Sequence, residues 1–172
     1  MTLETERLIL RMFHEDDFES SARICVDPEV MRYIADGKPF TRLEAWRHMA
    51  FLIGHWHLRG YGPWAVEEKE SGRMVGRIGF LNPDGWPSFE VGWTLAKEVW
   101  GRGYATEGAR RALEYAFNEL NQAHVISLIH PDNKASIRVA ERLGEKLEGK
   151  AEVFGRDDLV YGIDRAAFRD AS

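Results

Sequence analysis

The chain has 172 residues, of which 44% are hydrophobic and 12% aromatic, so we expect one domain over residues 1–172 with a substantial core. Its 23 basic and 28 acidic residues give a net charge of −5, which argues against a general binder of nucleic acid or of acidic membranes. The single cysteine, Cys25, cannot form an internal disulfide. The amino terminus is polar, and no apolar run reaches about 20 residues, so we expect a soluble, cytoplasmic protein.

The first third of the chain predicts one strand followed by two helices. Residues 7–11 contain three consecutive aliphatic side chains, as expected of a short buried strand. The helix that follows ends at Asp27-Pro28, and residues 31–34 form a loop or a short helix. Thr41 with Glu44 makes a capping box, which predicts a second helix that ends near Gly60.

The middle of the chain is rich in strands. Residues 62–68 and 73–81 predict two strands of a hairpin joined by a Ser-Gly turn. Residues 82–85 (Asn-Pro-Asp-Gly) predict a further turn. Residues 89–95 alternate apolar with polar or glycine positions, so the third of these strands has two distinct faces.

The last third alternates helices and strands. Apolar residues repeat at helical spacing from Thr106 to Leu120, and residues 125–129 form a continuous apolar strand. A helix over 133–143 is ended by Gly144, and residues 145–164 read as two strands. This order of elements predicts a mixed α/β (α+β) sheet of about six or seven strands with about four helices.

The segment Trp100-Gly-Arg-Gly-Tyr-Ala-Thr-Glu107 lies between a predicted strand and a predicted helix. Its glycines let the backbone approach a ligand closely, and the start of the helix offers unpaired N–H groups and a positive dipole end. Together these features predict a phosphate cradle. The lysine of a Walker loop is missing, and Thr106 stands where a dinucleotide fingerprint needs glycine. A tight turn without a ligand is the alternative that this motif alone leaves open.

Further motifs accompany this segment along nearly the whole chain. They are 5–11 (Thr-Glu-Arg-Leu-Ile-Leu-Arg), 27–31 (Asp-Pro-Glu-Val-Met), 115–120 (Tyr-Ala-Phe-Asn-Glu-Leu), 131–139 (Pro-Asp-Asn-Lys-Ala-Ser-Ile-Arg-Val) and 142–144 (Arg-Leu-Gly). In this order the motifs resemble the GNAT acetyltransferases, in particular the branch that acetylates ribosomal-protein N-termini. The resemblance implies a sheet whose fourth and fifth strands splay apart, with acetyl-CoA in the gap.

The resemblance also implies which residues hold acetyl-CoA. The backbone of Trp93, Thr94 and Leu95 is expected to pair with the pantetheine arm and the acetyl carbonyl, and Asn133 to hydrogen-bond the pantetheine end. The amides expected to hold the pyrophosphate are those of Gly101, Arg102, Gly103, Tyr104, Ala105 and Thr106. The chain departs from the family pattern at Trp100, where Gln or Arg is common, and at Glu145, where the family usually has Phe. An acid at position 145 calls the local strand geometry into question.

Three residues are candidates for the chemistry. By the resemblance, Ser136 is expected near the thioester sulfur, where its hydroxyl can donate a hydrogen bond; an ordinary place in the first turn of a helix is the alternative. Glu90 lies on the strand that leads to the glycine loop and is a candidate base, with a solvated strand carboxylate as the other interpretation. His130 follows the central strand and is a second candidate base, or a capping residue for the next helix.

These observations predict an N-acetyltransferase that moves an acetyl group from acetyl-CoA directly to a primary amine in a ternary complex. An α-amine with a pKa near ~7.8 needs only a weak base, whereas a lysine near ~10.4 needs more help. The acceptor is expected to be a protein N-terminus or a small amine, with no metal, nucleic acid or membrane involved, and the resemblance allows a homodimer. The alternative is a non-catalytic acyl-CoA-binding or sensing module.

Overall fold

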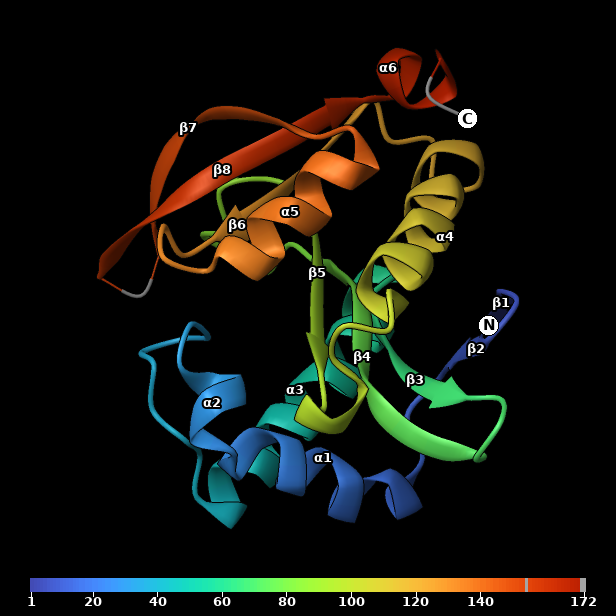
Figure 1. Ribbon diagram of the computed structural model, residues 1–172, viewed down its shortest axis with the longest axis vertical. Coiled ribbons are helices and arrows are strands. Elements are labelled where there is room, and N and C mark those ends of the chain that lie inside the picture. The colour runs from blue at the N-terminus through green and yellow to red at the C-terminus, as the bar shows by residue number, and fades with distance from the viewer. Residues whose placement is uncertain (154, 171–172) are drawn as a thin grey trace.

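The computed structural model describes residues 1–153 and 155–170, and its strands form one mixed sheet in the order β1-β2-β3-β4-β5-β6-β8-β7 (Figure 1). The strands are β1 (Leu3–Glu4), β2 (Leu8–Arg11), β3 (Pro63–Glu68), β4 (Arg73–Leu81), β5 (Glu90–Leu95), β6 (His124–Ile129), β7 (Lys146–Val153) and β8 (Arg156–Asp164). The helices are α1 (Phe18–Val26), α2 (Pro28–Met31), α3 (Arg42–Arg59), α4 (Tyr104–Asn118), α5 (Lys134–Leu143) and α6 (Arg165–Asp170), with 3₁₀ turns η1 (Glu15–Asp17) and η2 (Lys97–Val99).

The mixed α/β architecture is as predicted, but the described residues hold eight strands and six α-helices, more than the six or seven strands and four helices expected. Strand β1 and helix α6 were not predicted, and α2 lies at Pro28–Met31, just before the loop or short helix expected at 31–34; the three are 2, 6 and 4 residues long, too short to show a clear periodicity. In addition, α4 begins at Tyr104 and not at Thr106, because Gly103 in a left-handed conformation serves as its N-cap. Among the described helices, none has the length and apolar character to span a membrane.

Helices cover both faces of the sheet. Arg77 and Ile78 are neighbours on β4, so their side chains point to opposite faces. The Ile78 face carries α4, whose Gly108 backbone comes so close that an added Cβ would lie 2.4 Å from Ile78 Cδ1. The Arg77 face carries α1, whose Cys25 lines a small hollow together with Arg77. The two faces therefore offer separate sides from which ligands can approach the centre of the sheet.

The sheet is open at its centre. Strand β5 pairs with β4 from Glu90 to Leu95, but its parallel partner β6 meets it in register only at Glu90↔Ile126. Beyond that pair the two strands diverge, as Figure 1 shows between β5 and β6. This is the splay that the resemblance implied, and it leaves one edge of β5 without a strand partner in the described structure.

Candidate active site

The glycine loop presents bare amides at the start of α4. Gly101 and Gly103 have φ angles of 78° and 83°, which glycine adopts without strain. Gly103 is the N-cap and makes no side-chain cap bond, so no side chain caps the first N–H groups of α4, those of Tyr104, Ala105 and Thr106. Together with the positive end of the helix dipole, these donors form a seat for an anion such as a pyrophosphate.

Charged side chains from distant segments hold this loop in place. Glu68, on β3, accepts hydrogen bonds from the Arg102 guanidinium (3.0 Å) and the Tyr104 hydroxyl (2.7 Å). Arg7 donates to the Arg102 carbonyl (2.9 Å) and to Glu107 in the first turn of α4 (2.7 Å). Sequence reasoning missed Arg7 and Glu68 as partners of the loop, and the only signal was the motif at residues 5–11. The loop is thus held in place, and two half-exposed guanidinium groups lie at it, that of Arg102 and that of Arg7 from the segment between β1 and β2.

The edge of β5 that faces the gap exposes alternate backbone groups. The carbonyl of Val91 accepts from Ser127 Oγ (2.9 Å), and that of Leu95 accepts from the Trp100 indole (2.9 Å). By the same alternation the Trp93 backbone faces the gap, whereas the Thr94 carbonyl lies toward Gly76 on β4. Of the three residues expected to pair with pantetheine, Trp93 is therefore the one best placed. The Trp100 indole, a departure from the family pattern, ties the strand end to the loop.

Ser136 and Asn133 lie on the other side of the gap, at the start of α5. Asn133 is the N-cap, and its Oδ1 accepts from the Ser136 backbone N–H (3.1 Å). The Trp93 indole donates to Ser136 Oγ (3.2 Å). An indole N–H can only donate, so the Ser136 hydroxyl keeps its own proton for another acceptor. Asn133 has its amide nitrogen left for a ligand, since its oxygen serves the cap.

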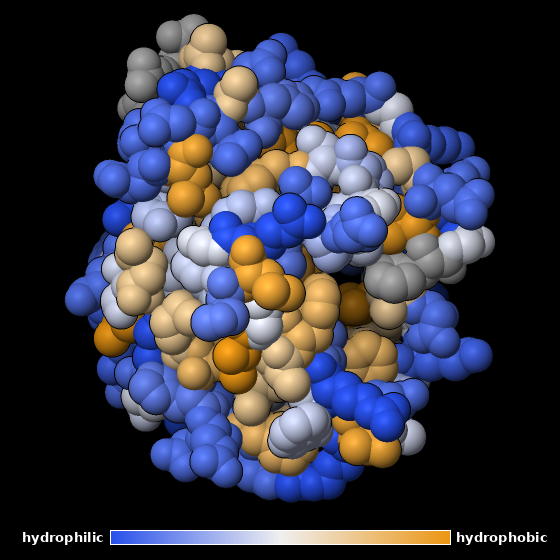
Figure 2. All heavy atoms as spheres, turned by 180° about the vertical axis from the view of Figure 1, so that it is seen from behind, coloured by the Kyte–Doolittle hydropathy of each residue, from blue (hydrophilic) through white to orange (hydrophobic). Residues whose placement is uncertain are grey.

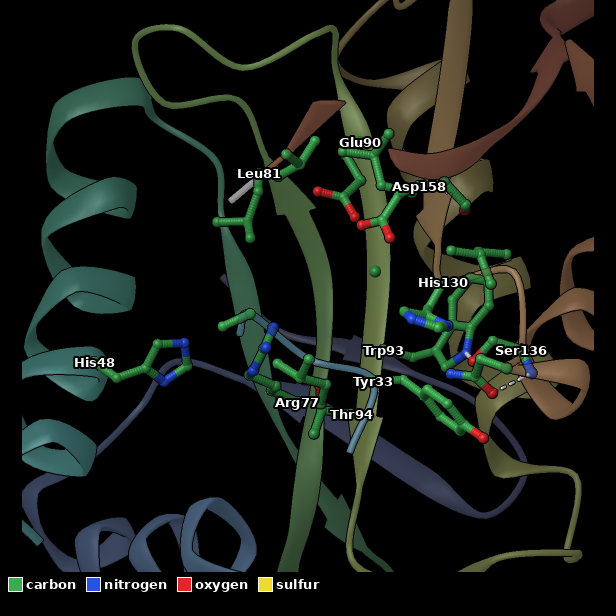
Figure 3. A pocket seen from close by; sticks show the side chains of 18 of the residues that line it. Tyr33, His48, Arg77, Leu81, Glu90, Trp93, Thr94, His130, Ser136 and Asp158 are labelled. Atoms are coloured by element: carbon green, nitrogen blue, oxygen red, sulfur yellow. Dashed lines mark hydrogen bonds between the residues drawn. The ribbon is translucent and has the colours of Figure 1, made fainter. Parts of the chain in front are cut away.

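A cavity of about 900 Å³ opens on the Arg77 face of the sheet. Its walls come from the segment between α2 and α3, from α3 itself, from β4 and β5, and from the ends of β6 and β8. Figure 2 shows the molecule from behind, with a hollow in this face and apolar atoms gathered across its middle. Glu90, His130 and Ser136 all line the cavity, so the structure brings the three candidate catalytic residues to one site (Figure 3).

Glu90 is not a solvated strand carboxylate, so that interpretation is wrong: the residue is only 8% exposed. Burial raises its pKa to about 7, and the negative charge of Asp158 acts in the same direction. A hydrogen bond from the Trp86 indole (2.8 Å) and the positive charge of Arg77 oppose this shift. Figure 3 shows the carboxyl groups of Glu90 and Asp158 pointing toward one another. The pKa places Glu90 in the range where a carboxylate takes up and releases a proton near neutral pH.

His130 has a local structural role as well as a place on the cavity wall. Its Nδ1 accepts from the Asp132 backbone N–H (3.1 Å), and its carbonyl accepts from the Asn133 N–H (2.9 Å), so it shapes the turn before α5. The ring lies 5.0 Å from the ring of Tyr33. Because Nδ1 is an acceptor here, the neutral imidazole carries its proton on Nε2 and is a donor there.

Strand β7 begins directly after Glu145, but its pairing with β8 shifts register between Leu147 and Gly149. The Glu145 side chain is 3% exposed, and burial raises its pKa to about 8, with the charge of Glu90 adding to the shift. Glu145 Oε1 accepts a hydrogen bond from Ser127 Oγ (3.1 Å), which also donates to the Val91 carbonyl (2.9 Å). The Ser127 hydroxyl, shared between the Val91 carbonyl and Glu145, joins β6 to β5 where the two strands part.

Comparison with known proteins agrees with this geometry. Residues 7–146 match the family model described as an acetyltransferase (GNAT) domain. Bacillus subtilis YkkB is 35% identical over 167 residues, which cover 92% of this chain and 93% of YkkB. An acetyltransferase of Agrobacterium tumefaciens, known from its crystal structure, is 33% identical with a TM-score of 0.86 and covers 96% of this chain and 95% of its own.

The likeness of fold extends to a protein of the expected branch. Mycobacterium smegmatis RimJ, solved in complex with CoA-disulfide, has a TM-score of 0.79 at 21% identity, over 96% of this chain and 88% of its own. The splayed sheet, the uncapped start of α4 and the matched family model lead to one conclusion. The chain belongs to the GNAT family and is an acetyl-CoA-dependent acyltransferase.

Proposed function

We propose that this protein transfers the acetyl group of acetyl-CoA to a primary amine by a direct step in a ternary complex. The observation that carries the proposal is the position of Glu90, a buried carboxyl with a pKa of about 7 at the point where β5 and β6 part. The donor reaches that point through the gap, and the cavity opens to it from the Arg77 face. A non-catalytic binding module has no need of a carboxyl with such a pKa at this place.

The donor side is made of backbone groups. The amides of residues 101–106 hold the pyrophosphate of acetyl-CoA, where the α4 dipole favours negative charge. The pantetheine arm then runs along the open edge of β5, where the Trp93 backbone faces the gap. Asn133 contributes its amide nitrogen from the opposite side, at the start of α5. The thioester reaches the region between Trp93 and Ser136.

The reaction itself needs one proton acceptor and one proton donor. The amine nitrogen attacks the thioester carbonyl carbon, a C–N bond forms, and the C–S bond breaks. Glu90 takes the proton that the amine loses, either directly or through one water molecule. The sulfur leaves with the electron pair of the broken bond and accepts a hydrogen bond from Ser136, whose proton is free. Binding both substrates in one site supplies the proximity that lowers the barrier.

Glu90 suits the role of base better than His130 does. At pH ~7.5 a carboxyl with a pKa of about 7 is mostly ionised and accepts a proton readily. The Nδ1 atom of His130 already accepts from Asp132, and Nε2 carries the proton, so the free side of the ring is a donor. His130, packed beside Tyr33, forms part of the acceptor wall instead.

A screen of acceptors tests this proposal. Acetyl-CoA-dependent thiol release is measured with protein N-terminal peptides, free amino acids, polyamines and aromatic amines, for the wild type and for Glu90→Gln. We expect turnover with at least one amine class, intersecting lines when both substrates are varied, and a strong loss in the variant. Tight CoA binding without turnover on any amine would contradict the proposal and favour a sensing module.

A further inference from the structure

Arg77 lines the cavity, and the described residues give its side chain no hydrogen-bond or ion-pair partner. It lies on β4 opposite Thr94 of β5, on the face that also carries Glu90. Among the described residues, no hydrogen bond or ion pair reaches its guanidinium group, although burial is strong enough to lower its pKa. The Cys25 thiol and then the Glu90 carboxyl act on its pKa in the opposite direction, and neither forms an ion pair with it. A guanidinium group with five donors is therefore left open inside the site.

Two other partly buried arginines, Arg11 and Arg156, pair with carboxylates. Arg11 contacts Asp17 and Glu67, each at 2.8 Å, and Arg156 contacts Asp158 at 3.0 Å. The contrast matters because a buried cation without a counter-charge is destabilising. A group kept in this state is typical of a binding site, where a ligand supplies the missing partner.

The carboxylates of the cavity have their own partners. Asp158 pairs with Arg156, Glu44 accepts from the Thr41 backbone N–H, and Glu90 accepts from the Trp86 indole. Asp36 lies beside Lys38 and accepts from its backbone N–H. In the described structure, none of them forms an ion pair with Arg77, so no described carboxylate of the cavity supplies its counter-charge.

His48 on α3 adds a second open group at the same place. Figure 3 shows its ring turned toward Arg77 across the cavity. Its Nδ1 is buried, and within residues 1–153 and 155–170 it has no hydrogen-bond partner. Burial and the charge of Arg77 lower its pKa to about 3, so the ring is neutral at neutral pH and has one donor and one acceptor nitrogen. A neutral imidazole can add one N–H bond to an anion that Arg77 holds.

We infer that Arg77 and His48 form a subsite for an anionic oxygen group, a carboxylate or a phosphate, carried by the amine that accepts the acetyl group. This inference rests on the proposed function, because it names the acceptor class of the same site. The amine lies at Glu90 and the anionic group at Arg77, both on one face of β4 and β5. Polyamines and other purely cationic amines are disfavoured by repulsion from the Arg77 guanidinium.

Matched pairs of acceptors test the subsite. Leucine and phenylalanine are compared with their α-amides, and phosphoethanolamine with ethanolamine, so that each pair differs in the anionic group. For each compound, kcat/KM is measured by thiol release, and binding to the CoA-saturated protein is measured by calorimetry. The amides have the less basic amines and hence the larger neutral fraction, so a preference for the acids reports recognition of the anion. The two kinds of pair distinguish a carboxylate from a phosphate.

Four proteins are compared: wild type, Arg77→Gln, Arg77→Lys and, as a matched control, Arg73→Gln on the exposed end of the same strand. We expect the wild type to favour one class of anionic acceptor by about 10- to 100-fold in kcat/KM, the range of a hydrogen bond to a charged group. Arg77→Gln loses that preference, Arg77→Lys keeps part of it, and Arg73→Gln keeps all of it.

The possible failures separate the two proposals. Turnover of the neutral partners as fast as the anionic ones, or a preference that survives in Arg77→Gln, overturns the subsite and leaves the acetyl transfer standing. Arg77-dependent binding of the anionic compounds without any turnover supports the subsite and overturns the proposed function. Absence of both binding and turnover across the panel overturns both.

Discussion

The two sides of the active site are built from different parts of the polypeptide. The donor side is mainly backbone: the glycine loop, the uncapped start of α4 and the open edge of β5. The acceptor side is mainly side chains, with Glu90, Arg77 and His48 on three different elements around one cavity. A backbone site suits a donor that is always the same molecule. A site made of side chains can change its acceptor without disturbing the fold.

The largest effect is expected on the acceptor side, from the loss of the proposed base. Glu90→Gln keeps the volume and the hydrogen bond from Trp86 but removes the proton acceptor, so kcat should fall about 10²- to 10³-fold. His130→Gln should change kcat by only a few-fold, because His130 lines the cavity and shapes the turn before α5 but takes up no proton in the proposed reaction. Steady-state kinetics at saturating acetyl-CoA measure both. Equal losses in the two variants would leave no reason to prefer Glu90.

A smaller effect is expected at Ser136, where the two sides meet. Ser136→Ala removes one hydrogen bond to the leaving sulfur and should lower kcat about 10-fold, with the affinity for acetyl-CoA nearly unchanged. Turnover is measured by thiol release and affinity by calorimetry. A variant that turns over as fast as the wild type would remove Ser136 from the mechanism.

On the donor side, the substitution Gly103→Ala tests the backbone site. An alanine at φ +83° is strained by about 1–2 kcal/mol, and relief of that strain shifts the amides that hold the pyrophosphate. We expect KM for acetyl-CoA to rise about 5- to 10-fold, with a much smaller change in kcat. Gly72→Ala is the matched control, since Gly72 has φ +65° in the β3–β4 turn and free space around it. If both variants raise KM equally, the effect comes from a loss of stability and not from a change at the pyrophosphate site.

The smallest effect on catalysis is expected at Glu145, which acts on stability. In the folded protein its pKa is about 8, against an ordinary value of 4.5, so the folded state keeps a proton that the unfolded state releases. The free energy of unfolding of the wild type should therefore fall as pH rises from about 5 to 8. Glu145→Gln should flatten that fall by about 1–3 kcal/mol, as urea unfolding at several pH values would show. Parallel curves for the two proteins would mean that Glu145 is ionised in the fold.

The backbone features of the proposed donor side were largely predictable from the sequence, whereas the surroundings of the proposed acceptor side were not. Glycines at 101 and 103 signal a backbone conformation directly, and the helix after them follows from its apolar stripe. The alternation in β5 places Glu90 on one face, but says nothing of what covers that face. The cover comes from α3, 31 to 48 residues earlier in the chain, and from Asp158 on β8, 68 residues later.

Arg77 and His48 belong to no motif, so they could not be found without the fold. A charged residue inside the strand Arg73–Leu81 was the only hint of an unusual environment for Arg77. At Glu145 the sequence showed a departure from the family but not its result, because the partner Ser127 comes from another strand. Strand β1 and helix α6 were missed because they are only 2 and 6 residues long, too short for a periodic pattern.

The pH dependence of kcat/KM with an accepted amine tests the central claim most directly. Glu90 must be ionised to accept the proton, and its pKa is raised to about 7, so the rate should rise about tenfold per pH unit below pH 7 and level off above it, apart from the ionisation of the amine itself. In Glu90→Gln the rise in kcat/KM that is due to Glu90 should disappear, and only the dependence on the ionisation of the amine should remain. A rise in kcat/KM near pH 7 that persists unchanged in Glu90→Gln would contradict the account.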